Sequence, residues 1–509
     1  MPSNRHWERY LLTTKPIPQD PSWAVEEFAA VALNDTRLNR RCQVLAGVLE
    51  QQPTMPLNQA CEDWADTKAA YRFMDNPKVS PEGLLAPHCH RTVERLTAHS
   101  VVLAVQDTTF LNYTAHPQTD GLGEIGKKVQ HQRGFGLHTT LALTPQGLPL
   151  GLLTQAFFTR PIGEAPHTPN ELRKLPIEEK ESYRWLEAFE QTIALTPDRV
   201  HMVTVCDREA DIYEMFVLAD NRQASLVVRA SADRCLAENK VKHLWAKVER
   251  QRRVGQLTVE ITGNHDRPAR QATVSIRFCR VTLKPPTRPH PQKLPPVTLT
   301  AILVREEHPP AAIDEPIEWL VLTNTTVSTF EDAVRVVGWY CCRWQIEIYH
   351  KVLKSGCQVE DSRLQTAGRL QNYIALMSVI AWRLHWLTYI NRTNPNQPCT
   401  VVLTTPEWQA LYLRIHKTSV FPKKLPTVHQ VIRWMAQLGG FLGRKSDGEP
   451  GITVIWRGWQ RLQDMAATWY LIVNEHPKLV GNCQVSGHRE LFSFEKVSRH
   501  RELFSSSGR

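Results

Sequence analysis

The stretch YCCRWQIEIYHKVLK, residues 340–354, decides how the rest of the chain is interpreted. It contains no Gly or Pro, and its polar side chains recur at helical spacing, which predicts a single helix. Steps of three and four residues place five polar side chains on one face of that helix, namely Tyr340, Arg343, Glu347, Lys351 and Lys354. One carboxylate is therefore flanked by a phenol, a guanidinium and two ammonium groups.

Such a stripe has two interpretations. A solvated face with ion pairs between neighbouring turns stabilises a helix by about 0.2–0.5 kcal/mol per pair, and for an isolated Glu347 this is the simpler one. A site for phosphodiester chemistry needs further carboxylates elsewhere in the chain. The choice therefore depends on whether the sequence supplies them.

Two short apolar runs end in carboxylates. Residues 101–105 (VVLAV) lead into Gln-Asp-Thr-Thr, and residues 202–206 (MVTVC) lead into Asp-Arg-Glu-Ala-Asp. Each run predicts a buried strand with an aspartate just past its end, Asp107 in the first and Asp207 in the second. The strands and helices around them indicate an α/β domain with a mixed sheet.

Asp107, Asp207 and Glu347 can converge on divalent metal. Hard oxygen ligands suit Mg²⁺, with Mn²⁺ as a substitute, and a pair of such ions activates the attacking oxygen and stabilises the leaving one in phosphodiester cleavage. Glu209 and Asp211 are rival ligands in the second motif. Asp207 is favoured because it lies at the strand end, whereas Asp211 would face one helical turn away.

Three motifs together resemble a known family. CDREADIY at 206–213, DTT at 107–109 and the pattern Tyr-x2-Arg-x3-Glu-x6-Lys at 340–354 are similar to those of the YREK subgroup of bacterial insertion-sequence DDE transposases, in particular the transposon-five type. The resemblance extends from near Trp23 to near Tyr470. It implies a ribonuclease-H-like catalytic domain with two Mg²⁺ ions per active site.

The resemblance also implies a reaction and its partners. In cut-and-paste transposition one strand is nicked at the transposon end, and the freed 3′-OH attacks the opposite strand to form a hairpin. Water reopens the hairpin, and the ends join target DNA. The partners are then double-stranded DNA, as terminal inverted repeats and target, and a second copy of the chain in a homodimer.

Family likeness assigns roles to the remaining polar residues. Arg343 and Lys354 would clamp phosphates, Tyr340 would position a phosphate through its hydroxyl, and Lys351 would add a contact. A larger group of expected DNA contacts lies elsewhere in the chain: Arg229 after a predicted strand, Trp319 in the place of a tryptophan that stacks on a flipped base, and the cluster Arg37, Arg40 and Arg41. The alternative for Trp319 is a tryptophan in the core, and the alternative for the arginine cluster is a solvated basic face.

Length and charge set wider limits. A chain of 509 residues is longer than one ordinary domain, and its net charge of +10 and pI near 9.1 suit a polyanionic partner without proving one. No signal peptide or apolar run of membrane-spanning length is visible, so we expect a cytoplasmic protein associated with the bacterial nucleoid. Eleven cysteines without a CxxC pair indicate reduced thiols.

Four parts are expected along the chain. They are a helical DNA-binding module at 1–79 with a flexible arm at 1–22, a catalytic domain at 80–390 with a β insertion at about 224–325, a helical dimerisation region at 391–476, and a disordered tail at 477–509 that contains HRELFS twice. Two rival functions share these features. A ribonuclease-H-like nuclease without strand transfer needs the same carboxylates, and a catalytically silent relic or inhibitor would keep only the binding of transposon ends.

Overall fold

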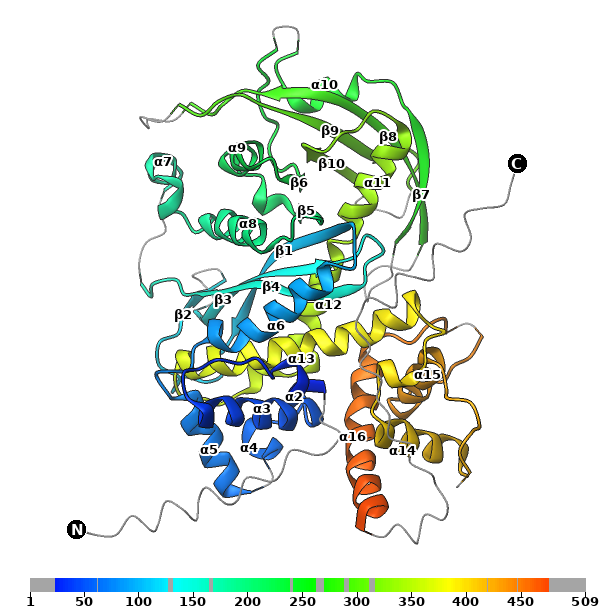
Figure 1. Ribbon diagram of the computed structural model, residues 1–509. Helices are drawn as coiled ribbons and strands as arrows, with labels where there is room; N and C mark the ends of the chain where they lie inside the picture. Colours follow the sequence, from blue (N-terminus) through cyan, green and yellow to red (C-terminus); the bar gives the residue numbers. More distant parts are fainter. Residues whose placement is uncertain are drawn as a thin grey trace, which may run out of the picture. The chain divides into compact units, whose positions relative to one another are not determined.

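The computed structural model describes residues 23–475 except 62, 127–130, 164–167, 239–240, 262–269, 288–292, 311–315, 419 and 446 (Figure 1). The flexible arm predicted at 1–22 and the tail predicted at 477–509 lie outside these residues. Backbone contacts divide the described chain into two compact units, one formed by residues up to 87 together with those from 394 onward, the other by residues 88–393. Within the described residues, no helix is both long and apolar enough to cross a membrane.

A mixed sheet forms the centre of the second unit. Its strands, as far as the structure describes the chain, are β1 (Val101–Asn112), β2 (Gly123–Ile125), β3 (Gln132–Leu143), β4 (Pro149–Phe158), β5 (His201–Cys206), β6 (Ser225–Arg229), β7 (Gly255–Ile261), β8 (Arg270–Leu283), β9 (Val297–Glu306) and β10 (Glu318–Thr323). Their order is β2-β3-β1-β5-β6-β10-β9-β8-β7, and β4 also pairs with β3. The mixed α/β class predicted from the sequence is confirmed.

Only the middle of this sheet is parallel. β5 runs parallel to β1 on one side and to β6 on the other, whereas the outer strands pair antiparallel. The apolar runs predicted to be buried strands lie in this middle: Val102–Val105 and Val203–Cys206 are fully buried. Burial on both faces explains why these runs do not alternate between apolar and polar residues. Strands β6 to β10, in the segment expected as an inserted β region, continue the same sheet.

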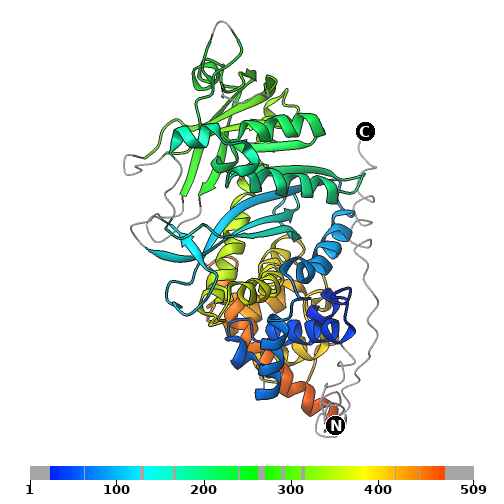
Figure 2. The ribbon, with the colours of Figure 1, turned by 90° about the vertical axis from the view of Figure 1, so that its left-hand side faces the viewer.

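Helices cover both faces of the sheet. The described helices of this unit are α6 (Pro81–Leu96), α7 (Pro169–Lys174), α8 (Tyr183–Leu195), α9 (Tyr213–Arg222), α10 (Leu244–Glu249), α11 (Phe330–Cys341), α12 (Trp344–Lys351) and α13 (Ala367–Thr393), of which the short α7 lies apart from the strands (Figure 1). α8 and α9 bury Trp185, Phe189 and Phe216 in one core cluster with β5, β6, β9 and β10 (Figure 2 faces this side).

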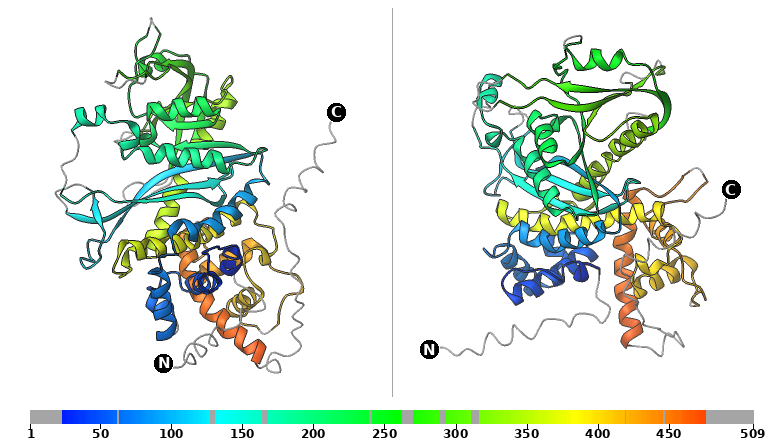
Figure 3. Two further views of the ribbon diagram at one scale, coloured as in Figure 1. Left: turned by 60° about the vertical axis from the view of Figure 1, so that its left-hand side comes forward. Right: turned by 45° about the horizontal axis from the view of Figure 1, so that its top comes forward.

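The opposite face of the sheet carries α12 and α13. Gln155 of β4 donates from Nε2 to the Tyr349 hydroxyl at 3.2 Å and to Ser378 Oγ at 2.9 Å, which ties both helices to the sheet through partly buried hydrogen bonds. α13 is buried on nearly every side, as a helix in the middle of a core is, and runs without interruption through its length (Figure 3).

The first unit consists of helices from both ends of the described chain. They are α2 (Trp23–Glu27), α3 (Thr36–Gln51), α4 (Leu57–Ala60) and α5 (Trp64–Met74), with α14 (Thr405–His416), α15 (Val428–Leu438) and α16 (Ile452–Glu475). Trp459 Nε1 of α16 donates to the Glu50 carbonyl at 2.9 Å, and Gln52 Nε2 donates to Asp464 Oδ1 at 2.8 Å. The N-terminal and C-terminal helices are therefore one packed body.

Two glycines allow α15 and α16 to approach closely. A Cβ atom on Gly439 would lie 1.8 Å from the Val454 carbonyl oxygen, and one on Gly458 would lie 1.8 Å from the Met435 carbonyl oxygen. No side chain fits at either position, so the two backbones pack directly against each other. Trp456, Trp459 and Leu462, which follow one another at intervals of three residues on α16, are buried and belong to the core of this unit.

Candidate active site

Two aspartates lie where the parallel strands β1 and β5 part. The two strands pair in register from Val101 beside His201 to Val105 beside Val205, and Asp207 follows the last residue of β5 as predicted. The prediction that β1 ends before Asp107 is wrong: β1 continues to Asn112, and Asp107 pairs with Thr139 of β3. The antiparallel partner β3 prolongs the strand after the parallel partner has ended.

The third carboxylate lies on a helix that is interrupted. The single helix predicted over 340–354 is wrong, because α11 ends at Cys341, α12 begins at Trp344 and a π-helical turn follows at 352–356. Tyr340 thus belongs to α11, Glu347 and Lys351 to α12, and Lys354 to the π-helical turn. The break has a packing cause, since α11 contacts β5 and β6 whereas α12 contacts β1.

Arg343 sits at this break and links two of the carboxylates. Its Nη1 lies 3.7 Å from Asp107 Oδ2, and its Nη2 donates to Glu347 Oε1. The side chains of Arg343 and Asp107 retain only 15% and 16% of their exposure, so this contact is poorly screened by water. The structure therefore brings Asp107, Arg343 and Glu347 together from a strand and a helix break.

The charges of Asp207 and Glu347 both act on the Asp107 carboxyl group. Burial raises the pKa of Asp107 to about 7, the Arg343 guanidinium opposes this rise, and the negative charges of Asp207 and Glu347 add to it. In the described parts of the chain, no three or more His, Cys, Asp or Glu side chains stand close enough to hold a metal ion. The donor type nevertheless suits a hard cation, because all three are carboxylates and two of them, Asp207 and Glu347, disfavour the charged form of Asp107.

The rival ligands in the second motif have other partners. The Asp211 side chain is fully buried and accepts hydrogen bonds from the Ser231 backbone at 2.8 Å and from Arg234 Nε at 2.7 Å. Glu209 is 60% exposed and forms an ion pair with Arg184 at 3.2 Å. Asp211 is thus a structural carboxylate. Asp207 is the residue of this motif whose negative charge raises the pKa of Asp107.

Three of the expected DNA contacts form one group. The Trp319 and Tyr340 rings pack edge to face with centroids 5.6 Å apart, and Trp319 is only half-buried. Arg229 donates to the Glu318 carbonyl at 3.2 Å; burial lowers the pKa of Arg229, and the Tyr340 hydroxyl beside it counteracts that effect. The structure therefore brings together Arg229 at the end of β6, Trp319 on β10 and Tyr340 near the end of α11.

The two lysines differ in their surroundings. Lys354 Nζ lies 3.7 Å from Glu360 Oε1, and the same carboxylate oxygen accepts a hydrogen bond from the Asn112 backbone at 2.7 Å, where β1 ends. Lys351 is exposed on α12. The π-helical turn thus directs Lys354 toward the end of β1, whereas Lys351 points to solvent.

Sequence reasoning missed two residues at this site. Trp344, directly after Arg343, is 56% exposed, an unusual exposure for so large an apolar side chain. Arg184 of α8 contacts residues of both aspartate motifs. Trp344 could have been noticed as an aromatic residue in a polar stretch, but nothing near Arg184 in the sequence points to β1 or β5.

The N-terminal arginines lie on the first unit. Arg37 pairs with Asp35 at 3.4 Å and Arg41 with Asp66 at 3.2 Å, whereas exposed Arg40 lines a surface cavity of about 510 Å³. The Arg37 side chain is 77% exposed, and exposed ion pairs contribute little free energy, so Arg37 can exchange its carboxylate for another anion at small cost.

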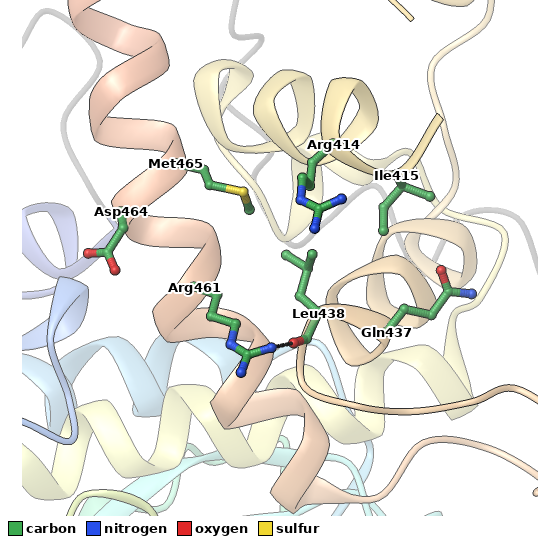
Figure 4. A pocket seen from close by; sticks show the side chains of 7 residues that line it. All are labelled: Arg414, Ile415, Gln437, Leu438, Arg461, Asp464 and Met465. Atoms are coloured by element: carbon green, nitrogen blue, oxygen red, sulfur yellow. Dashed lines mark hydrogen bonds between the residues drawn. The ribbon is translucent and has the colours of Figure 1, made fainter. Parts of the chain in front are cut away.

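A second surface cavity of about 460 Å³ lies among the C-terminal helices of the same unit (Figure 4). Ile415, Leu438 and Met465 supply its apolar lining and Arg414, Gln437, Arg461 and Asp464 its polar lining. Arg461 donates to the Leu438 carbonyl and so satisfies one of the last carbonyls of α15.

Comparison with protein-family models gives two matches. Residues 20–79 match the model described as transposase DNA-binding, and residues 379–469 match the model described as transposase Tn5 dimerisation domain. The three carboxylates and Arg343 lie between the two matched regions. Taken together, the two matches support a Tn5-like transposase.

Proposed function

We propose that this chain is a DDE transposase of the YREK subgroup, with a ribonuclease-H-like catalytic domain, that performs cut-and-paste transposition of an insertion sequence. One observation carries the proposal: Asp107 and Asp207 lie beside the ends of paired parallel strands, and Arg343 joins Asp107 to Glu347 on the facing helix. The matches to a DNA-binding and a dimerisation domain on either side of this arrangement support it.

Three carboxylates would hold the metal. Asp107, Asp207 and Glu347 are the residues we assign to two Mg²⁺ ions, for which Mn²⁺ can substitute. When bound, such ions activate the attacking oxygen and stabilise the leaving one. With its charge balanced in this way, the Asp107 carboxylate would no longer need Arg343, and the guanidinium would be available to another anion.

That anion is a DNA phosphate. Arg343 has a planar fork that can hold phosphate oxygens in a bidentate manner, as it now holds two carboxylates. Lys354, near the end of β1, and Lys351, exposed on α12, would add positive charge, and Arg229 would add it near Tyr340. Arg37, Arg40 and Arg41 would contact the transposon end through the N-terminal helices.

Aromatic side chains suit the hairpin step. Forming a hairpin requires the last base pairs of the DNA end to open, and an extruded base is stabilised by stacking. Half-buried Trp319, whose ring packs against Tyr340, and exposed Trp344, which follows Arg343 in the chain, are the aromatic side chains we assign to this stacking. Double-stranded DNA, as terminal repeat and target, and a second copy of the chain are the partners; the place of action is the bacterial nucleoid.

Cleavage of linear DNA that carries the gene with its natural flanks tests the proposal. With Mg²⁺ the wild type is expected to produce discrete double-strand breaks at the borders of the element, and chelation of Mg²⁺ abolishes them. Asp207→Ala and Glu347→Ala should lose the breaks while still shifting the DNA in a gel. Binding without cleavage by the wild type would support the silent relic, and cleavage by Asp207→Ala would show that the metal site is wrongly placed.

A further inference from the structure

Arg184 lies on α8, behind the sheet as seen from the carboxylates. Successive side chains of a strand point to opposite faces, so Asp107 faces Arg343 whereas Thr108 faces α8. Arg184 Nε donates to Thr108 Oγ1 at 3.0 Å. The arginine therefore reaches the first aspartate motif from the face opposite the Asp107 side chain.

The same guanidinium also reaches the second motif. Its Nη2 lies 3.2 Å from Glu209 Oε2, and its Nη1 donates to the Glu181 carbonyl at 2.6 Å. The guanidinium stacks 4.8 Å from the centre of the Phe158 ring, and the side chain is only 12% exposed. Each guanidinium nitrogen thus has a partner, and the group is fixed in one orientation.

Thr108 and Glu209, whose side chains contact Arg184, also donate backbone hydrogen bonds to the two aspartates. The Thr108 backbone N–H donates to Asp107 Oδ1 at 2.8 Å. The Glu209 backbone N–H donates to Asp207 Oδ1, also at 2.8 Å. One oxygen of each carboxylate is therefore oriented by a residue whose side chain is bound to Arg184.

Thr108 is fixed from a second side. Its hydroxyl accepts from Arg184 and forms a second hydrogen bond with His138 Nδ1, 2.8 Å away. Burial lowers the pKa of His138 to about 3, so the ring is neutral and its Nδ1 can accept. The centre of the His138 ring lies 4.6 Å from that of the Trp185 ring, and Trp185 follows Arg184 in the chain.

We propose that Arg184 is a positioning residue that sets the relative placement of Asp107 and Asp207 for binding divalent cations. This inference rests on the proposed function of those aspartates as metal ligands. Arg184 acts through Thr108 and Glu209 and does not touch the metal. Outer-shell partners of this kind typically change metal affinity by about 10–100-fold when removed.

Two simpler roles make different predictions. If Arg184 acted only as a positive charge near the carboxylates, its removal would strengthen cation binding, and a lysine would preserve the wild-type affinity. If Arg184 only contacted DNA, cation binding without DNA would not change. A lysine has one donor group on a flexible stem and cannot bridge Thr108 and Glu209 as the planar fork does.

Binding of Mn²⁺ to the full chain without DNA, followed by electron paramagnetic resonance of the unbound ion, separates these roles. Arg184→Ala and Arg184→Lys should both weaken Mn²⁺ binding by about 10-fold or more. Thr108→Val should weaken it as well, and the Thr108→Val/Arg184→Ala double variant should be no weaker than the stronger single variant, because both remove one connection. Arg222→Ala, which breaks the exposed pair with Glu190 on α8 and α9, is the matched control and should bind as the wild type does.

Wild-type affinity in Arg184→Lys, or tighter binding in Arg184→Ala, would overturn the positioning role. Absence of Mn²⁺ binding by the wild type would overturn the metal site and the positioning role together. Thermal unfolding of each variant without metal identifies a loss of the fold. Should Arg184→Ala unfold, Glu209→Gln serves in its place, because this exposed side chain loses its ion pair without leaving a cavity.

Discussion

The Arg343 guanidinium lies 3.7 Å from the Asp107 carboxylate, at the break between α11 and the helix α12 that carries Glu347. Arg343 and Glu347 keep the contact between positions i and i+4 that a continuous helix through 340–354 would also give. The break lets α11 and α12 pack on different strands and places Arg343 between them. Arg343, which pairs with Asp107 and Glu347 here, is the side chain that we expect to bind a phosphate when DNA is present.

Arg343→Lys is expected to impair cleavage without impairing recognition of the transposon end. A lysine keeps the charge but cannot bind two oxygens in a plane, so we expect the rate to fall by about 10²-fold, as when one preorganised donor is removed. Single-turnover cleavage and gel-shift affinity measure the two effects separately. A fall in affinity that accounts for the whole loss of rate would contradict this role.

Asp211 and Asp207 should respond in opposite ways to substitution. Asp211→Ala leaves Arg234 largely buried without its partner, and unfolding in urea should show a loss of about 3 kcal/mol in stability. Asp207→Ala removes one charge of a mutually repelling set, so stability should be unchanged or higher while cleavage is lost. Glu190→Ala, which breaks an exposed ion pair, is the control and should cost less than about 1 kcal/mol. Preserved stability in Asp211→Ala would refute its structural role.

Trp344→Ala should leave stability unaffected and slow hairpin formation. Its ring is 56% exposed, so little packing is lost, whereas one base would lose stacking of about 1–3 kcal/mol. A DNA end with an unpaired terminal base should restore much of the rate, since less energy is then needed to open it. Equal defects on paired and unpaired ends would argue against stacking.

Gly458→Ala should destabilise the first unit. The added methyl group would lie 1.8 Å from the Met435 carbonyl oxygen, and separating α15 from α16 should cost about 1–3 kcal/mol in a denaturant titration. Gly451→Ala is the matched control, because no atom lies within 4 Å of the added methyl group. Equal stability of the two variants would show that the close crossing is not needed.

Local sequence predicted the parts of the site that depend on local chemistry. The run before Asp207 is apolar and short, so a buried strand ending there could be read from residues 202–206 alone. The continuation of β1 past Asp107 could not, because it depends on pairing with β3 some thirty residues later. The same holds for the break at Cys342, which no Gly or Pro marks and which follows from helices packing on different strands.

Long-range contacts explain the remaining differences. Asp211 looked like a second candidate ligand because its charge was visible and its partners, Ser231 and Arg234, were not. Arg184 looked like an ordinary helix residue because its contacts with Thr108 and Glu209 join separate elements across the sheet. Residue type predicts which chemical groups are available, whereas the order of the strands in the sheet decides which of these groups come into contact.

Asp207→Cys tests the central claim most directly, namely that this carboxylate binds the metal ion that cleaves DNA. A thiolate is a softer ligand than a carboxylate and binds Mg²⁺ poorly, but it accepts Mn²⁺ better. We predict that Asp207→Cys fails to cut DNA carrying the element's borders in Mg²⁺ and recovers cutting at the same borders in Mn²⁺. Cleavage at the wild-type rate in Mg²⁺ would contradict the account.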